Sequence, residues 1–436
     1  MKHPIAGALA LAIATALAGC ASTPATTAAA QESPMTGIAY SGPFAAPSTL
    51  DLNYPRFDQI KDSDFAPAFD AGMAIQLGEI DAIANNPEPA TFQNTIVAME
   101  KTGLLLDRAT GVFFNLVGTD KNDARDKLQS GYAPKFSAHR DAITLNPKLF
   151  ARIKALHDAR ATLGLDAVDQ RLLERRYDDF VRGGAALTEA QKARIREINT
   201  EMSKLGTQFG QNVLAEVNDS AVVVDTRAEL AGMSDEQVAA AGEAAKARGL
   251  EGKYVIALLN TTGQPAEAQL QDRALRERLH KASVARGSRG GKYDNTAIVS
   301  QVLKLRAERA KLLGYDTSAN FVLADETAGN QDNVNAMLRQ LAPAAVANAK
   351  REAADLQAMI DREQKAKGQP TFRLEPWDWS YYSEKVRQER YSFDESQLKP
   401  YFEMKNVLEN GVFFAATKLY GITFKERTDL PKYHPD

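Results

Sequence analysis

Hydrophobic side chains recur every three or four positions over most of the chain after residue 50, which is the spacing of an α-helix. The clearest segment opens with the capping box Thr188-x-x-Gln191. Its apolar positions follow at helical intervals: Ile195, Ile198, Met202, Leu205, Phe209 and Val213. This pattern predicts one long helix with a single apolar face.

The same spacing, together with capping residues, predicts four further helices. They are one capped by Asp64 and running to about Ile80, one capped by Asp294 and ending before Gly314, one from Asp332 to near Gly368, and one from Met404 to Leu419 that stops at Gly421. Pro343 lies inside the third of these and is expected to kink it.

Strand patterns are sparse. Residues 221–224 and 254–259 are short runs that favour β-structure, and residues 422–424 alternate over three positions only. We therefore predict a mainly α fold with a few short strands.

The amino terminus has the pattern of an export signal. Lys2 precedes an apolar run over residues 6–17, which is too short to span a bilayer. Leu17-Ala18-Gly19-Cys20 resembles a bacterial lipobox, so residues 1–19 are predicted to be a signal peptide and Cys20 to be lipidated. The alternative is an ordinary secretory signal cut after Ala18.

Lipidated Cys20 would anchor the protein to a membrane by its acyl chains without spanning it. Because Ala21 is not an Asp-type retention signal, the resemblance implies a periplasm-facing protein on the outer membrane. Residues 20–48 are rich in Ala, Ser, Thr, Pro and Gly, and we expect them to form a flexible tether.

Composition excludes several classes of protein. The 436 residues contain 53 Lys and Arg against 56 Asp and Glu, a net charge of −3, whereas a nucleic-acid binder normally needs a basic surplus. The single cysteine excludes an internal disulfide and a cysteine-rich zinc site.

No complete catalytic motif is present in the printed sequence. None of the five histidines has a second histidine four residues away, so the zinc-peptidase motif His-Glu-x-x-His is absent. Glu277-x-x-His280 is half of a di-iron signature without its second half, and a solvated helix face is the expected reading. No catalytic, cofactor-binding or metal-binding residue is assigned.

Residues 287–293 (Gly-Ser-Arg-Gly-Gly-Lys-Tyr) resemble a phosphate-binding loop only superficially. Arg286 and Tyr293 occupy the positions where the motif needs Gly and Ser or Thr. We expect a flexible basic loop before the helix that Asp294 caps. Whether this loop lies on a binding surface stays open.

The aromatic cluster Trp377-Asp378-Trp379-Ser380-Tyr381-Tyr382 contains both tryptophans of the chain. It has two interpretations: a wall for peptide side chains, or a packed cluster at the start of a helix capped by Asp378 that runs to about Arg390. We favour the packed cluster.

Several segments together resemble the thimet-oligopeptidase-like zinc metallopeptidases, and most of all the bacterial peptidyl-dipeptidases (dipeptidyl carboxypeptidases). They are residues 374–379 (Leu-Glu-Pro-Trp-Asp-Trp), 393–402 (Phe-Asp-Glu-Ser-Gln-Leu-Lys-Pro-Tyr-Phe), 407–413 (Val-Leu-Glu-Asn-Gly-Val-Phe), 420–422 (Tyr-Gly-Ile), 433–436 (Tyr-His-Pro-Asp), 92–95 (Phe-Gln-Asn-Thr), 209–213 (Phe-Gly-Gln-Asn-Val) and 259–262 (Leu-Asn-Thr-Thr). The resemblance covers nearly all of residues 50–436.

This resemblance implies helical lobes flanking a channel that admits oligopeptides, and a zinc-activated water as nucleophile. It assigns residues 49–330 to an amino-terminal lobe and 331–436 to the start of a catalytic lobe, with the zinc ligands beyond Asp436. We therefore expect a truncated, inactive portion of a peptidyl-dipeptidase. The missing part would cover the apolar face of the 404–419 helix, which would otherwise be exposed.

Two alternatives stay open at this point. One is a shorter, non-catalytic, lipid-anchored envelope protein that binds peptides. The other is a chain complemented by a separate polypeptide that carries the zinc ligands.

Overall fold

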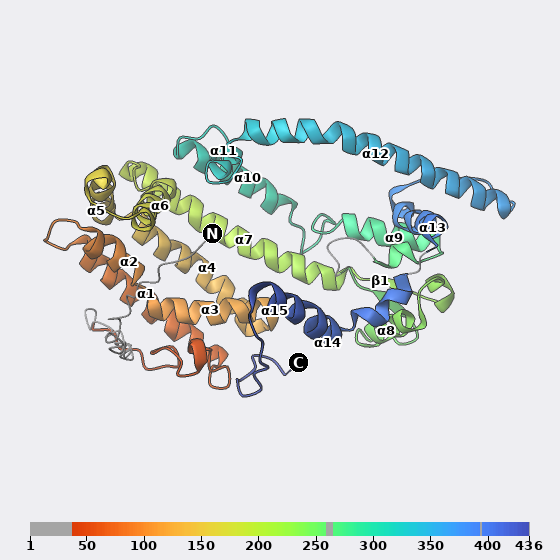
Figure 1. Ribbon diagram of the computed structural model, residues 1–436, viewed down its shortest axis with the longest axis horizontal. Coiled ribbons are helices and arrows are strands. Elements are labelled where there is room, and N and C mark those ends of the chain that lie inside the picture. The colour runs from red at the N-terminus through yellow and green to blue at the C-terminus, as the bar shows by residue number, and fades with distance from the viewer. Residues whose placement is uncertain (1–36, 259–264, 393–394, 436) are drawn as a thin grey trace, which may run out of the picture.

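The computed structural model describes residues 37–258, 265–392 and 395–435, and within these ranges the protein is mainly helical, as predicted (Figure 1). The first helices are α1 (Asp62–Ala84), α2 (Ala98–Glu100), α3 (Leu104–Thr119), α4 (Asp123–Thr144), α5 (Pro147–Asp158), α6 (Ala167–Gly183) and α7 (Glu189–Asp219). The later helices are α8 (Asp235–Lys246), α9 (Arg273–Val284), α10 (Thr296–Leu312), α11 (Ser318–Leu323), α12 (Gln331–Ala366), α13 (Trp379–Tyr391), α14 (Met404–Asn406) and α15 (Phe414–Tyr420).

Shorter helical segments connect these helices. Two are π-helical, Phe92–Val97 and Val407–Phe413. The others are 3₁₀ turns: Asp51–Asn53, Arg160–Thr162, Arg227–Leu230, Pro265–Ala268, Pro376–Asp378 and Glu395–Phe402.

Local signals placed several helix ends correctly. At the start of α7, the Gln191 N–H donates to the Thr188 hydroxyl oxygen at 3.4 Å, and the Gln191 side chain accepts from the Thr188 N–H at 3.1 Å, which completes the predicted capping box. Gly314 and Gly421 follow α10 and α15 with positive φ angles of 84° and 68°. This is the left-handed conformation that favours glycine after a helix.

Other boundaries differ from the prediction. α1 begins at Asp62, and the Asp64 carboxylate reaches back to accept from the Lys61 N–H at 2.8 Å. α12 begins at Gln331, one residue before the predicted start at Asp332, and continues past Pro343 to Ala366. The last predicted helix consists of α14, the π-helical stretch Val407–Phe413 and α15.

Two of the three predicted strand segments are confirmed. β1 (Val222–Val224) and β2 (Tyr254–Ile256) pair antiparallel, with Val223 opposite Val255. Residues 422–424 form no strand with any part of the chain that the structure describes. The small sheet packs with α8 and α9 around its own apolar cluster.

The main aromatic core lies between α1, α3 and α4. Phe65, Phe69 and Phe113 have no exposed surface, and the Phe113 ring centroid lies 5.1 and 5.2 Å from those of Phe65 and Phe69. These edge-to-face contacts are the preferred geometry of aromatic pairs. Phe44 is 3% exposed and belongs to the same core. The tether predicted for residues 20–48 was therefore drawn too long at its C-terminal end, because packed structure already begins at Phe44.

Helix α7 connects this core to the opposite end of the molecule. In Figure 1 it runs from α5 and α6 at the left toward β1 and α8 at the right. Ile195 and Ile198 are fully buried, but Phe209 and Val213 further along the same face are 40% and 39% exposed. The predicted single apolar face is therefore buried only in its first half, because the second half runs beyond the core.

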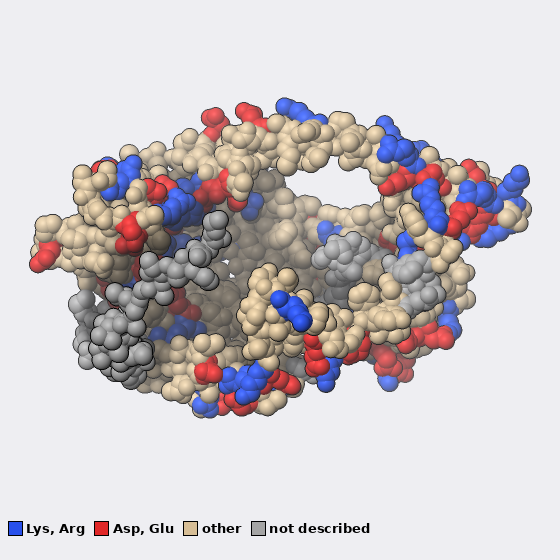
Figure 2. All heavy atoms as spheres, in the orientation of Figure 1, with Lys and Arg blue, Asp and Glu red and all other residues tan. Residues whose placement is uncertain are grey.

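Helix α12 forms a bar along one edge of the molecule. Figure 2 shows an open window beneath it. From Ala336 to Glu352 every side chain of α12 is exposed, whereas Leu356 and Ile360 are buried against α13. Contacts cross the boundary predicted at residue 330, since α13 packs against the 3₁₀ turn Pro265–Ala268 and the turn before α13 packs against α9.

The expected exposure of the last helix is confirmed. Met404, Val412 and Leu419 are 81%, 53% and 74% exposed. The segment after α15 returns to the beginning of the described chain, where the Arg427 guanidinium pairs with Asp51 at 2.8 Å. Among the helices in the described ranges, none combines the length and the hydrophobicity needed to cross a bilayer.

Candidate functional site

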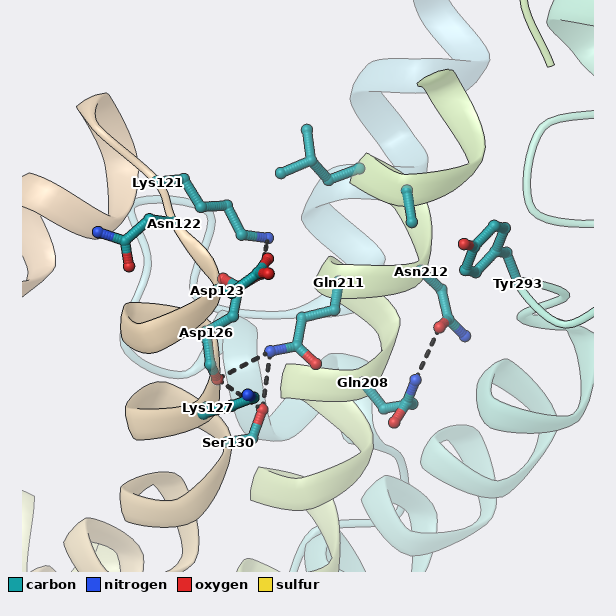
Figure 3. Close-up of a pocket in the computed structure, with 12 residues that line it drawn as sticks. Lys121, Asn122, Asp123, Asp126, Lys127, Ser130, Gln208, Gln211, Asn212 and Tyr293 are labelled. Carbon is teal, nitrogen blue, oxygen red and sulfur yellow. Dashed lines mark hydrogen bonds and ion pairs between the residues drawn. The ribbon is translucent and has the colours of Figure 1, made fainter. Parts of the chain in front are cut away.

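A cavity of about 760 Å³, lined mainly by residues with polar side chains, lies between α4 and α7 (Figure 3). Its lining comes from the first turns of α4, the second half of α7 and the loop before α10. The lining residues are Lys121, Asn122, Asp123, Asp126, Lys127, Ser130, Gln208, Gln211, Asn212, Leu214, Ala215 and Tyr293. Three of them, Gln211, Asn212 and Tyr293, belong to segments singled out in the sequence.

The two helices are held at this level by side-chain hydrogen bonds. Asn122 caps α4, accepting from the Arg125 N–H at 2.9 Å. The Gln211 amide donates to the Ser130 hydroxyl at 2.7 Å and to the Asp126 carbonyl at 3.3 Å. In Figure 3, Gln211 points from α7 toward α4, whereas Asn212 points toward Tyr293.

The amides of α7 form a chain that ends in the protein interior. Gln208 donates to Asn212 at 2.7 Å, and Asn212 donates to Asn295 at 2.9 Å. Asn295 in turn donates to the Phe209 carbonyl at 3.2 Å. Because Asn212 and Asn295 are buried, these bonds hold the start of α10 against α7.

The basic loop at residues 287–293 is tied to α7, contrary to the predicted flexible loop. The Gly287 N–H donates to the Glu216 carboxylate, and Arg289 pairs with the same carboxylate at 3.3 Å. Within the loop, the Gly290 N–H donates to Asp294 at 2.7 Å. The loop thereby places Tyr293 on the cavity wall.

The cavity lining is nearly neutral and rich in amides. Lys121 and Asp126 form an ion pair at 3.0 Å, and Lys127 and Asp123 balance each other in charge. The lining includes no histidine or cysteine. The arrangement therefore offers hydrogen-bond donors and acceptors for binding a ligand.

Glu277 and His280 do not act together. Glu277 pairs with Lys281 at 2.6 Å, one turn along α9, as expected for a solvated helix face. His280 instead faces Glu267, whose carboxylate oxygen lies 3.9 Å from its Nδ1 atom. Burial raises the pKa of the Glu267 carboxyl to about 7.

The aromatic cluster is packed, as favoured from the sequence. Asp378 is completely buried, and its carboxylate pairs with Arg273 at 2.8 Å and with Arg276 at 3.0 Å. The Arg276 guanidinium lies 4.2 Å from the ring centroid of Tyr381. Asp378 therefore joins α9 to the start of α13 and makes no side-chain cap on α13, which corrects the predicted capping role.

The described residues do not fit a zinc site. In residues 37–258, 265–392 and 395–435, no three His, Cys, Asp or Glu side chains come together as metal ligands. The predicted signal peptide at 1–19 and the lipidation site Cys20 lie outside the described residues.

Comparison with known proteins identifies relatives. Residues 267–436 match peptidase family M3. The chain is 43% identical to the dipeptidyl carboxypeptidase of Escherichia coli (strain K12) over 394 residues, or 90% of this chain. The resemblance to the thimet-oligopeptidase-like peptidases is confirmed.

Other relatives agree with this result. The dipeptidyl carboxypeptidase of Salmonella typhimurium is 42% identical over 90% of this chain, and oligopeptidase A of Escherichia coli is 30% identical over 89%. The chain spans 57% of the length of each of these curated relatives. Over most of its length the chain is therefore similar to part of a dipeptidyl carboxypeptidase, and residues 267–436 match peptidase family M3.

Proposed function

We propose that these residues form the peptide-binding part of an M3 metallopeptidase that hydrolyses oligopeptides and releases C-terminal dipeptides. The observation that carries the proposal is the 43% identity to a dipeptidyl carboxypeptidase over 394 residues. The cavity between α4 and α7 supports it, because one of its walls is built from the family-like segment at residues 209–213.

The chemistry of the cavity suits a peptide backbone. Each peptide unit offers one N–H donor and one C=O acceptor, and each glutamine or asparagine amide offers the complementary pair. Gln208 and Gln211 line the cavity from successive turns of α7. The nearly neutral lining contributes little long-range attraction, so binding should depend weakly on salt.

Hydrolysis in this family uses zinc, according to the resemblance, and the printed sequence has no His-Glu-x-x-His. We infer that the 436 residues bind peptide and that turnover requires zinc ligands supplied from outside them. The purified chain should therefore bind oligopeptides equally well with and without a chelator. It should not cleave a quenched fluorescent peptide when zinc is added.

The test uses fluorescence polarisation with labelled oligopeptides. Combining Gln208→Ala with Gln211→Ala should weaken binding about tenfold, since each lost hydrogen bond costs about 0.5–1.5 kcal/mol. Gln340→Ala, on the exposed part of α12, is the matched control and should bind like the unchanged chain. Stoichiometric zinc with peptide turnover, or unchanged binding by the double variant, would contradict the proposal.

We also propose that Cys20 is lipidated and anchors the protein to the outer membrane, facing the periplasm. The proposal is supported by the lipobox-like Leu17-Ala18-Gly19-Cys20 at the end of an apolar run. Cys20→Ser should move the protein from the membrane fraction to the soluble fraction. An unmodified Cys20 thiol in the mature protein, detected by mass spectrometry, would disprove it.

A further inference from the structure

A second cavity, of about 430 Å³, lies between α4, α7 and α10. In the amide-lined cavity Lys121 pairs with Asp126, whereas an acidic and a basic side chain in the wall of this second cavity are not paired with each other. Asp141 comes from α4 and Arg309 from α10. They line the same space, yet no ion pair between them occurs within 4 Å in the described part of the chain.

Asp141 is only half satisfied. Its side chain is 6% exposed, and the Asn199 amide donates to one carboxylate oxygen at 2.8 Å. The other oxygen, Oδ2, is buried and has no hydrogen-bond partner among the described residues. Burial raises the pKa of this carboxyl, while nearby Arg309, Arg196 and Arg140 oppose the rise. A buried carboxylate normally has partners for both oxygens, so Oδ2 lacks a donor.

Asp141 Oδ2 lacks a hydrogen-bond donor, and Arg309 lacks a hydrogen-bond acceptor, among the residues that the structure describes. Its Nε–H is buried without an acceptor in the same described ranges. Burial lowers the pKa of Arg309, and the positive charges of Arg182 and Arg140 lower it further, with only Asp141 acting in the opposite direction. Asp141 is thus the one anion that acts on Arg309 among the described residues, and it does not accept from the Arg309 Nε–H.

We propose that this cavity binds a short peptide with two free ends, its ammonium group on Asp141 and its carboxylate on Arg309. An ammonium group supplies the donor that Oδ2 lacks, and a carboxylate accepts from a guanidinium in a planar, charge-assisted pair. The volume falls within the range of about 300–1,000 Å³ that is usual for small-ligand sites.

The remaining walls suit peptide side chains. Phe114, Phe136 and Met202 supply apolar surface, and Ser137 and Ser203 supply hydroxyl groups. The choice of a dipeptide as the ligand rests on the proposed function, which releases dipeptides. The requirement for one positive and one negative end rests on Asp141 and Arg309 alone.

Isothermal titration calorimetry with an Ala-Phe dipeptide tests the proposal on the purified chain. The dipeptide with free ends should bind, and blocking either end, by N-acetylation or C-amidation, should weaken binding at least tenfold. Equal affinity for the free and blocked forms would overturn the proposal. Tighter binding of a single free amino acid than of any dipeptide would overturn the choice of ligand.

Two variants should test the contact with the ammonium group and the contact with the carboxylate separately. Arg309→Gln should abolish discrimination between the free and amidated dipeptide, and Asp141→Asn should abolish discrimination between the free and acetylated one. A merely structural role would weaken all forms alike, which would refute the assignment. Arg306→Gln, an exposed arginine one turn earlier on α10, is the control and should change neither preference.

A third variant keeps the proposal testable if the first two variants fail to fold. Ser203→Phe fills the cavity from α7 and keeps both charged groups, so it should abolish dipeptide binding. Dipeptide binding that survives in a folded Ser203→Phe protein would place the ligand elsewhere. The Gln208→Ala, Gln211→Ala variant should bind the dipeptide normally, which separates a failure of this site from a failure of the proposed function.

Discussion

The helices around α1, α3 and α4 differ from the later helices α12, α14 and α15 in what covers their apolar residues. Phe65, Phe69 and Phe113 are fully buried. Leu341 of α12 and Leu419 of α15, which also occupy regularly spaced apolar positions, are 58% and 74% exposed. The spacing is alike in the two regions, and the burial is opposite.

This difference shows what helical spacing measures. Spacing reports that one face of a helix is apolar, but the partner of that face lies far away in the sequence or in another molecule. Exposed apolar side chains gathered on one element mark surfaces that contact something else. We infer that α14, α15 and the first half of α12 are contact surfaces.

The largest effect should come from the ion pairs of buried Asp378, which join α9 to the start of α13. Asp378→Ala leaves Arg273 and Arg276 without their carboxylate and should lower the free energy of unfolding by about 3–5 kcal/mol. Asp355→Ala breaks the exposed pair with Arg390 and should cost less than about 1 kcal/mol. Urea unfolding of both variants measures these changes. Equal losses of unfolding free energy would show that the burial of Asp378 does not set the strength of its ion pairs.

Two phenylalanines compare the regions directly. Phe113→Ala opens a cavity in the aromatic core and should cost about 3–4 kcal/mol in unfolding free energy. Phe414→Ala on α15, where the ring is 57% exposed, should cost less than about 1 kcal/mol. A large loss from Phe414→Ala in the isolated chain would show that α15 is covered in solution.

The buried carboxyl of Glu267 should make stability depend on pH. Its pKa in the folded protein is about 7 against an ordinary value of 4.5, so the unfolded chain gives up its proton first as pH rises. Stability should therefore fall between about pH 4.5 and pH 7, by roughly 2–3 kcal/mol.

Glu267→Gln should remove this part of the pH dependence, as measured by urea unfolding at pH 5 and pH 8. Glu277→Gln, a change to the neighbouring carboxylate that pairs with Lys281, should retain it. If the slope persisted in Glu267→Gln, another group would be its source.

The smallest effect on stability, with a clear effect on association, should come from α14 and α15. Met404→Glu with Leu419→Glu places charges on side chains that are 81% and 74% exposed, so unfolding free energy should change by less than about 0.5 kcal/mol. Self-association in sedimentation velocity should decrease, whereas Lys418→Glu alone should not decrease it. If the chain without substitutions were monomeric at every concentration, α14 and α15 would not form a self-association surface.

The features that the sequence predicted are those decided within a few residues. The Thr188 capping box, the glycines after α10 and α15 and the strands at Val222–Val224 and Tyr254–Ile256 depend on neighbours in the chain. The mainly α fold followed from these local signals and from the period of the apolar positions.

The features that the sequence missed depend on distant partners. Asp378 resembles a helix cap locally, but Arg273 and Arg276, about one hundred residues earlier, decide its role. The loop at Tyr293 is tied by Glu216 on another helix. Of the candidate site, the sequence identified Gln211, Asn212 and Tyr293 only as members of unusual segments, because a cavity between two helices leaves no pattern in either one.

Helix α12 is supported mainly at its ends. At one end the Gln331 N–H donates to Asn320 of α11 at 3.2 Å, and at the other Arg362 pairs with Glu389 of α13 at 2.8 Å. Thirty-six residues of helix span about 54 Å, so a tilt of about 5° at one support would displace the other by about 5 Å. Helix α12 would thus act as a lever arm, through which a small rotation beside α11 becomes a large displacement of α13.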